Sequence, residues 1–575
     1  MKNIYKIFAL AMFICFSACD ELDENLTSPV EVSPESVDIN SLYNKIQLDL
    51  EEMQSDLWYD PAAVSRMIAY TSSYQYVDAS SANTLNDVWQ DIYEGMWPDI
   101  ELLVEIAQER SLPVYEGTAK ILKAYTMFVL VDMFGDVPYS EATLGVEVIS
   151  PSADSGSEVY ASAIALLDEA ITLLSSAEDA AAPTYDNFYG GDVDSWIALA
   201  NTLKLRAAVT TRLVDASAST ATINEILSGG EFIDTESEDF EFSYGSTREN
   251  PNSRHPLYNG GYETSTGDYM SNYYMWLLRG EKLDDNGNAV VDPRIRYYFY
   301  RQIENASEQD VTVYSCHFSS YPDQDQKPDH YIDVDPRMPY CIAFVDDGYL
   351  GRDHLNGEGI PPDGELRTLY GLYPAGGQFD ENSFTSQQQS GTTGAKGQGI
   401  WPLMLSSYVD FLRAEAALTL GTNDDARALL ESGMQKSFDK VMGFSSLDAT
   451  TFSGTVTIRG EEVSIEDAYV PTDDDVAEYI AYVLEQYDAA SGESAKLDIL
   501  MKEYYIALWG NGLEAYNMYR RTGMPSNMAP GLESGSGDFI RSYFYPAVNV
   551  ERNANMVQKN ITDAVFWDDS SVTLY

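Results

Sequence analysis

The sequence predicts a mostly α-helical fold, an α-solenoid of four helical hairpins with a loop-rich subdomain inserted and packed on it. Two observations lead to this prediction. Long segments carry apolar residues at helical spacing, as Trp196, Leu199 and Leu203 do, and short breaks separate these segments into pairs. The stretch 240–400 lacks this period and is rich in Gly, Pro, Asp, Asn and Tyr. We therefore expect a single folded domain over residues 41–575.

The four hairpins are expected at 84–134, 157–214, 403–441 and 474–521. The first joins helices at 84–110 and 116–134 through the turn Ser111-Leu112-Pro113. The others join 157–174 to 195–214, 403–420 to 424–441 through Gly421-Thr422-Asn423, and 474–489 to 494–521. Paired helices of this kind suggest a tetratricopeptide-like solenoid, although the 34-residue period of that repeat is absent.

The stretch 240–400 is expected to form an ordered, ligand-binding subdomain. Such a long irregular region is usually either functional or disordered, and its many aromatic residues argue against disorder. It holds all four histidines, which lack the spacing of metal ligands. A few short strands are expected there, for example at 310–317.

The N-terminal residues 1–18 have the layout of a secretory signal peptide, with Lys2 and Lys6 before a short apolar run. The ending Phe16-Ser17-Ala18-Cys19 resembles a bacterial lipobox, which would make Cys19 the lipidated N-terminus of the mature protein. An ordinary signal cleaved near a cysteine is the alternative. Residues 19–40 are acidic and rich in Ser and Pro, so we expect a flexible tether, and its first acidic residues also resemble the surface-export signal of Bacteroidetes lipoproteins.

Charge limits the partners of the chain. The formal net charge is −58, and it becomes −60 once Lys2 and Lys6 leave with the signal. This excludes nucleic acid, which needs clustered Lys and Arg. No apolar run in the mature chain is long enough to span a bilayer, so the membrane would be reached through lipid on Cys19. Cys316 and Cys341 remain; a disulfide and two buried thiols are both compatible with an exported protein.

Several phrases resemble the SusD/RagB family of nutrient-binding outer-membrane lipoproteins. They are VDMFGDVPYSEA (131–142), DPRIRYY (292–298), the long phrase 351–380 that begins GRDHLNGEG, YVDFLRAEAAL (408–418), GLEAYNMYRRTGMP (512–525), and RSYFYP with NANM near the C-terminus. The resemblance covers nearly the whole mature chain. It implies a cell-surface protein without catalytic activity that hands its ligand to a TonB-dependent outer-membrane barrel of the SusC type.

No catalytic constellation is visible in the sequence. It has no HExxH, no G-x-S-x-G, no Walker A loop and no G-x-G-x-x-G that opens a helix. A glycosidase needs only two carboxylates, however, so a surface glycan hydrolase stays as an alternative.

Aromatic residues of the irregular region are the best candidates for ligand contact. Sugar rings stack on Trp and Tyr, and peptides use similar surfaces. The segment NYYMWLLR supplies Asn272, Tyr273, Trp276 and Arg279, and further candidates are Tyr74, Tyr76 and Trp401. The helical spacing within this segment fits core packing equally well. We expect an oligosaccharide ligand, with a peptide as the alternative.

One acidic loop is a weak candidate for calcium. Asp284, Asn286, Asn288 and Asp292 alternate as oxygen ligands do in a calcium loop. The glycine and the final glutamate of an EF-hand are missing, and a plain Asn-Gly turn explains the same residues.

Overall fold

The computed structural model describes residues 37–177, 180–264, 267–304, 327–340, 347–357, 366–387 and 390–575. Over these residues the protein is mostly helical and has three small two-stranded sheets, so the predicted fold class is confirmed. The predicted signal segment, Cys19, Cys316, Cys341 and the strand expected at 310–317 lie outside the described residues. Among those described, no helix combines the length and the apolar character needed to cross a membrane.

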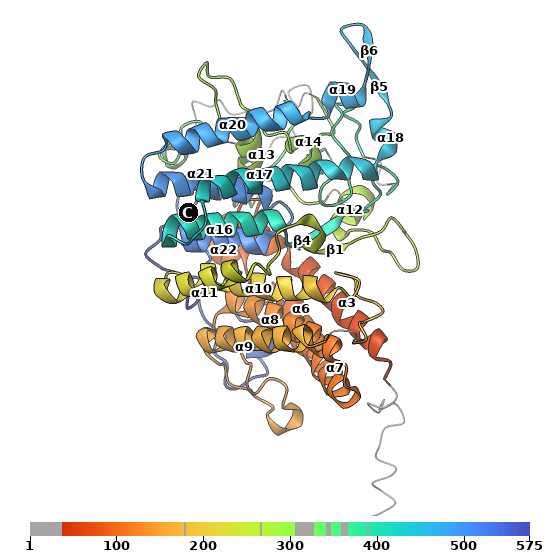
Figure 1. The fold of residues 1–575 in the computed structure, drawn as a ribbon. Helices are drawn as coiled ribbons and strands as arrows, with labels where there is room; N and C mark the ends of the chain where they lie inside the picture. The colour runs from red at the N-terminus through yellow and green to blue at the C-terminus, as the bar shows by residue number, and fades with distance from the viewer. Residues whose placement is uncertain are drawn as a thin grey trace, which may run out of the picture.

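The longer helices form a stack, which Figure 1 shows from α7, α8 and α9 at the lower end to α17 and α20 at the upper end. Their bounds are α3 (Ile39–Leu57), α4 (Tyr59–Val64), α7 (Trp97–Arg110), α8 (Pro113–Phe134), α9 (Gly156–Ser175), α10 (Val193–Thr210), α11 (Ala216–Gly229), α16 (Ser406–Leu420), α17 (Ala426–Gly443), α20 (Asp473–Ala489), α21 (Glu493–Ala507) and α22 (Gly512–Thr522).

The predicted hairpins correspond to the pairs α7/α8, α9/α10, α16/α17 and α20/α21. Their turns follow local chemistry. α7 ends at Ser111 in the left-handed region, and Pro113 begins α8, where its missing N–H costs nothing. Gly421, also left-handed, ends α16, and the side chain of Asp425 caps α17.

Two of the predicted helices are broken. The first expected helix is split into α6 (Asn86–Gln90), the π-helical segment η2 (Asp91–Met96) and α7. The last is interrupted between α21 and α22, where Gly510 has φ +101° and the side chain of Asn511 caps α22. The folded domain, expected from residue 41, includes α3, which begins at Ile39 with Asp38 as its N-cap.

A buried hydrogen-bond network around Asp132 joins the helices of the scaffold. Its carboxylate accepts hydrogen bonds from Arg206 of α10 (2.6 Å), Asn517 of α22 (2.9 Å) and the indole of Trp567 (2.9 Å), and from Tyr160 of α9. Asp132 itself belongs to α8 and is fully buried. One carboxylate therefore ties three other helices and the C-terminal segment to α8.

The loop-rich stretch leaves and re-enters the helical scaffold through two paired strands. β1 (Phe240–Ser243) runs antiparallel to β4 (Ile400–Met404), with Phe242 opposite Trp401 and Ser243 opposite Ile400. The rest of the stretch consists of short pieces: α12 (Pro256–Asn259), η5 (Gly260–Thr264), α13 (Asn272–Arg279), α14 (Ile295–Tyr298), β2 (Phe299–Tyr300), α15 (Asp329–Ile332) and β3 (Leu369–Tyr370).

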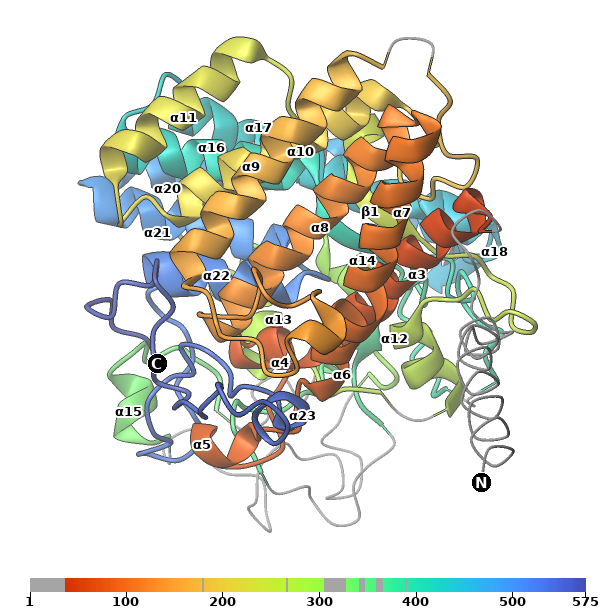
Figure 2. The ribbon, with the colours of Figure 1, turned by 90° about the horizontal axis from the view of Figure 1, so that it is seen from below.

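The remaining elements lie outside the main helical pairs. They are α5 (Tyr76–Ala79), η3 (Gly145–Glu147), η4 (Glu236–Glu238), η10 (Phe444–Leu447), α18 (Ala449–Phe452), β5 (Thr455–Ile458), β6 (Glu461–Ser464), α19 (Ile465–Tyr469) and α23 (Ala547–Val550). The β5–β6 hairpin projects at the upper right of Figure 1. The segment 523–575, which includes α23, lies at the lower left of the view in Figure 2.

Candidate functional site

Most of the predicted aromatic residues lie in the core. Tyr76, Tyr273, Trp276 and Trp401 are only 1–3% exposed. The Trp401 ring stacks on His255, with centroids 4.9 Å apart and planes at 11°, and it meets Trp58 edge to face at 6.2 Å. These four rings therefore expose almost none of their surface to solvent in this structure.

The segment 351–357 brings two groups of the predicted residues together. His354 Nε2 lies 2.9 Å from the hydroxyl of Tyr76, and Asp353 accepts a hydrogen bond from the Asn272 amide at 3.0 Å. Gly357 packs against the backbone of Ser73 and half-buried Tyr74, where a Cβ would lie within 3.0 Å of that backbone. Trp401 lies apart from this group, on β4.

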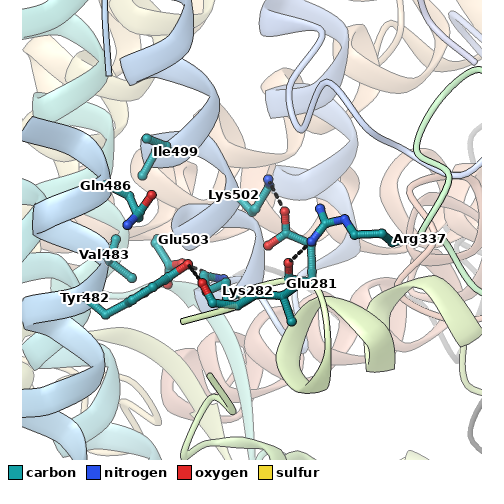
Figure 3. A pocket seen from close by; sticks show the side chains of 10 residues that line it. Glu281, Lys282, Arg337, Tyr482, Val483, Gln486, Ile499, Lys502 and Glu503 are labelled. Atoms are coloured by element: carbon teal, nitrogen blue, oxygen red, sulfur yellow. Dashed lines mark hydrogen bonds and ion pairs between the residues drawn. The ribbon is translucent and has the colours of Figure 1, made fainter. Parts of the chain in front are cut away.

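The other end of α13 borders a pocket, which we call the clasp pocket (Figure 3). Its volume is about 280 Å³. The segment that follows α13 forms one wall, and side chains on one face of α20 and one face of α21 form the others. The lining residues are Glu281, Lys282, Leu283, Arg337, Tyr482, Val483, Gln486, Ile499, Lys502 and Glu503.

Two crossed ion pairs close one side of the clasp pocket. Glu281 meets Lys502 at 2.8 Å, and its neighbour Lys282 meets Glu503 at 3.0 Å. Burial alone would raise the pKa of Glu281, but the charges of Lys502 and Lys282 outweigh it and lower this pKa. Burial alone would lower the pKa of Lys502, but Glu281 and nearby Asp498 raise it. Glu281 and Lys502 therefore both stay charged at neutral pH.

A further cation and a phenol complete the rim of the pocket. Arg337 donates to the backbone carbonyl of Glu281 (2.7 Å), and its guanidinium lies 5.8 Å from the ring centroid of Trp276. Tyr482 donates from its hydroxyl to the carbonyl of Leu283 (3.0 Å). Trp276, a predicted site residue, thus lies behind Arg337 and supports the pocket from within the core.

A buried charge network lies beneath the clasp pocket and fixes Glu503. The carboxylate of Glu503 accepts a hydrogen bond from the hydroxyl of Tyr479 (3.1 Å) and lies 3.4 Å from the guanidinium of Arg294. Arg294 is paired with Asp292 at 2.6 Å, and both side chains are fully buried. Such a network holds the pocket floor in one arrangement, because each charge is compensated only in that geometry.

Arg279, the last residue of α13, points to a different neighbourhood. It forms an ion pair with Asp347, and its guanidinium lies 5.8 Å from the centroid of the Tyr349 ring. The predicted segment is therefore divided: Asn272 contacts the 351–357 segment, Trp276 packs in the core behind Arg337, and Arg279 turns toward Asp347 and Tyr349.

The predicted calcium loop folds as a turn in which the carboxylate of Asp284 accepts hydrogen bonds from within the loop. Asp284 accepts hydrogen bonds from the backbone N–H of Asn286 (2.8 Å) and of Asn288 (2.7 Å) and from the Asn288 amide (2.9 Å). Asp292 is engaged with Arg294 in the buried network. Among the described residues, no group of three or more His, Cys, Asp and Glu side chains is arranged to hold a metal ion.

The clasp pocket presents groups that would suit a small polar ligand. It offers ammonium and guanidinium donors, carboxylate acceptors, the amide of Gln486 and the ring of Tyr482, which together suit hydroxyl groups. Its volume lies just below the range of roughly 300–1,000 Å³ for small-molecule sites, so it would take one sugar unit or one side chain of a longer ligand. Glu281, with its lowered pKa, is unsuited to donate a proton as a general acid.

The residues of the clasp pocket were missed in the sequence, although a signal was present. Lys502 and Glu503 interrupt the apolar face of LDILMKEYYIALW, and Glu281-Lys282 directly follows the aromatic segment. One place has the order Glu-Lys and the other has the order Lys-Glu, so the two dipeptides are complementary and can form two ion pairs with each other. The two pairs lie 221 residues apart in the chain, so no local pattern shows that they meet.

Two family models match the chain. One, described as starch-binding and associating with the outer membrane (SusD-like), covers residues 31–337. The other, described as SusD and RagB outer-membrane lipoprotein, covers residues 367–569. No curated protein sequence matches the chain.

Solved structures share the fold. A SusD/RagB family protein from Bacteroides thetaiotaomicron superposes with a TM-score of 0.64 at 19% identity, over 92% of this chain and 99% of its own. A SusD-like protein from the same organism gives 0.62 at 18% identity, over 93% and 100%. A SusD homologue from Flavobacterium johnsoniae, described as chitin-binding, gives 0.58 at 20% identity, over 92% and 99%.

Proposed function

The chain belongs to the SusD/RagB family of outer-membrane lipoproteins, and we propose that it captures an oligosaccharide at the cell surface and delivers it to a TonB-dependent transporter of the SusC type. The family binds nutrients and is not catalytic. In this proposal Cys19 carries the lipid that holds the protein at the membrane. Which glycan this chain binds, and with which residues, is part of the proposal.

The observation that carries the proposal is the clasp pocket in a protein of this family. Hydroxyl groups of a sugar both donate and accept hydrogen bonds, and the pocket presents both kinds of partner: Lys502 and Arg337 donate, and Glu281 accepts. Tyr482 supplies a half-buried ring beside them. The residues near Tyr74 and Asn272, which the sequence suggested, remain a second candidate contact area for a longer chain.

A peptide ligand is the alternative of the same binding class. The charged pairs of the clasp pocket suit an amino or carboxylate group as well as a hydroxyl group. A glycan hydrolase is the alternative of a different class, and it would release product from the bound glycan.

The test is a binding screen with the purified full-length protein in detergent, against a panel of neutral and acidic oligosaccharides and of peptides. Titration calorimetry measures affinity, and chromatography of the incubated ligand detects cleavage. We expect an oligosaccharide to bind without any product. Binding of peptides alone would contradict the glycan proposal, and release of shorter sugars would favour the hydrolase.

Lys502→Ala tests the pocket, and Lys120→Ala is its matched control. Both lysines are largely buried and ion-paired, Lys502 with Glu281 and Lys120 with Glu116 and Glu169, but Lys120 lies between α8 and α9. Loss of a charged hydrogen bond to the ligand is worth about 1.5–3 kcal/mol. We expect Lys502→Ala to weaken glycan binding by at least tenfold and Lys120→Ala to leave it unchanged; equal affinities of the two variants would exclude this pocket as the site.

A further inference from the structure

A second pocket lies further along α20 from the clasp pocket. Its volume is about 290 Å³, and we call it the Tyr469 pocket. Residues of the segment 291–296 form one wall, and the segment 467–472 and the side chain of Asp475 form the other. The segment 467–472 contains the end of α19, which Figure 1 shows next to the first turn of α20.

The two pockets lie along one face of α20. Asp475 lines the Tyr469 pocket, and Tyr482, seven residues further on, lines the clasp pocket. Seven residues are close to two helical turns, so these two positions share a face and lie about 10 Å apart along the helix axis. Gln486, another residue of the clasp pocket, continues the same face. A single sugar ring cannot reach across this distance, whereas a short chain of sugars can.

A hairpin turn forms the opposite wall of both pockets. Its two arms are joined by the hydrogen bond from the backbone N–H of Val290 to the carbonyl of Lys282 (2.9 Å). Leu283, in the first arm, lines the clasp pocket, and Val291, in the second arm, lines the Tyr469 pocket. The hydroxyl of Tyr482 fastens the turn to α20 through the carbonyl of Leu283 (3.0 Å). The same two structural elements, the turn and α20, therefore enclose both pockets.

Apolar and aromatic side chains remain accessible in both pockets. Leu283 is 37% exposed and Val291 is 47% exposed. Each pocket also contains a half-buried tyrosine, Tyr482 in the clasp pocket and Tyr469 in the other. Aliphatic side chains and aromatic rings suit the C–H faces of sugars, and the tyrosine hydroxyls suit their polar edges. Both pockets therefore offer contacts of the kind that a sugar unit needs.

The charges around the two pockets favour a neutral chain. The lysines and glutamates of the clasp pocket pair with one another, and Arg337 has a carboxylate partner of its own at 3.0 Å. The Tyr469 pocket contains one cation, Arg296, and two carboxylates, Asp467 and Asp475. The turn 284–289 adds two aspartates, and neither this turn nor α20 contains Lys or Arg. Carboxylate groups on a sugar chain would therefore meet like charge along most of this path.

We propose that the clasp pocket and the Tyr469 pocket are two subsites of one groove, which binds a neutral oligosaccharide long enough to span both. The proposal rests on the proposed function for the class of ligand, and it adds the charge and the minimum length of that ligand. Each pocket alone lies just below the usual size of a small-molecule site. A chain that occupies both gains affinity because its second contact is intramolecular.

The test measures affinity against chain length, with the purified full-length protein in detergent. The neutral probes are maltooligosaccharides, xylo-oligosaccharides and chito-oligosaccharides from disaccharide to hexasaccharide, and the acidic probes are oligogalacturonides of the same lengths. We expect the affinity for at least one neutral series to rise at least tenfold between disaccharide and hexasaccharide. Oligogalacturonides should bind at least tenfold more weakly at equal length. Absence of binding by all three neutral series, or equal affinity for the acidic hexasaccharide, would overturn the groove proposal.

Tyr469→Ala separates the two subsites, and Tyr139→Ala is its matched control. Both tyrosines are half-buried beside a cation, with Arg296 5.0 Å from the ring centroid of Tyr469 and Lys123 5.7 Å from that of Tyr139, but Tyr139 lies between α8 and α9. Tyr469→Ala should remove the at least tenfold gain of the hexasaccharide and leave the affinity for the disaccharide unchanged. Lys502→Ala should weaken both ligands. Tyr139→Ala should change neither affinity.

Val291→Asp gives the same readout without removing a packed ring, because Val291 is largely exposed. It should also remove the gain of the hexasaccharide and spare the disaccharide. Circular dichroism and the melting temperature check that all variants are folded.

The failure of this proposal differs from the failure of the proposed function. If chain length has no effect on affinity, or if Tyr469→Ala and Val291→Asp affect disaccharide and hexasaccharide equally, the Tyr469 pocket is not a subsite, while glycan capture stands. If the unaltered chain binds peptides and no oligosaccharide of either charge, the proposed function itself fails, and the groove proposal fails with it.

Discussion

The carboxylate of Asp132 accepts a hydrogen bond from the indole of Trp567 at 2.9 Å, which joins two residues that lie 435 positions apart in the chain. Arg206 donates to the same carboxylate and also meets Glu514 at 2.6 Å. The VDMFGD phrase of the sequence therefore supplies the central acceptor of the helical scaffold rather than a ligand contact.

Removal of this acceptor should destabilise the protein severely. Asp132→Ala leaves Arg206, Asn517 and Trp567 without a shared partner in the core, and breaking a buried ion pair costs about 3–5 kcal/mol. Urea unfolding measures the change. Asp168→Ala is the control, because Asp168 is an exposed partner of Lys204, and surface pairs are worth about 1 kcal/mol or less. Equal losses in the two variants would contradict the central role of Asp132.

The Trp276 ring should matter for stability. It is 2% exposed and lies under Arg337, so Trp276→Ala removes a core side chain and should cost about 3–5 kcal/mol. Tyr185→Ala, at a ring that is 55% exposed, should cost little. A Trp276→Ala protein with an unchanged melting temperature and weakened ligand binding would instead make this ring a ligand platform.

The crossed ion pairs of the clasp pocket should be energetically coupled. In a double-mutant cycle of Glu281→Gln and Lys502→Met, each single variant leaves one largely buried charge without its partner, and the double variant removes both. We expect a coupling energy of about 1–2 kcal/mol in urea unfolding. The Asp168–Lys204 pair serves for comparison and should give at most about 1 kcal/mol. A coupling energy near zero would mean that solvent screens the attraction between Glu281 and Lys502.

His255 should make the protein less stable in mild acid. Burial lowers its pKa to about 3, while its pKa in the unfolded chain is about 6.5. Between these two pKa values the His255 imidazole is protonated in the unfolded state and neutral in the folded state. The free energy of unfolding therefore falls as the pH drops below about 6.5. For this group alone the loss between pH 8 and pH 5 is about 2 kcal/mol.

His255→Asn tests this dependence and keeps a side-chain acceptor at the cap of α12, where His255 accepts from the N–H of Leu257. The difference in unfolding free energy between pH 8 and pH 5 should shrink by about 2 kcal/mol in the variant. Asp60, whose pKa burial raises to about 7, acts in the opposite direction, but equally in both proteins. An unchanged pH profile would show that His255 does not carry the effect.

Cys19 should be required for membrane attachment and not for folding. It precedes the described residues, and we expect Cys19→Ala to leave the melting temperature unchanged while the protein moves from the membrane fraction to the soluble fraction. Fractionation followed by immunoblotting measures this. Persistent membrane association of the variant would mean that something other than lipid on Cys19 holds the protein.

The helical scaffold could be predicted because its signals are local. The spacing of apolar residues gave the pairs, and Ser111-Leu112-Pro113 and Gly421 gave their turns. The π-helical segment η2 has no such local signal, because its extra residue per turn depends on what packs around it. The break before α22 did have one, since Gly510 and Asn511 form a stop and a cap, but the apolar residues on either side concealed it.

The candidate site was predicted only in part. The sequence drew attention to α13 because aromatic residues gather there, but aromatic content does not distinguish a ligand platform from a core, and Trp276 and Tyr273 are buried. Glu281 and Lys502 of the clasp pocket lie 221 residues apart in the chain, and only the tertiary fold brings them together. These pocket residues can be identified from their positions in the folded structure and not from their residue types.

The order of charges in the two ion pairs of the clasp pocket also fixes how the segment after α13 aligns with α21. Glu281-Lys282 faces Lys502-Glu503, so a slip by one residue would place Lys282 against Lys502, or Glu281 against Glu503. Either misalignment opposes like charges in a largely buried place, where repulsion is costly. The two ion pairs therefore disfavour shifted alignments of these segments. An insertion or deletion of one residue between α13 and Glu281 should be poorly tolerated. A change in length at the exposed turn Asn286-Gly287 should be tolerated well.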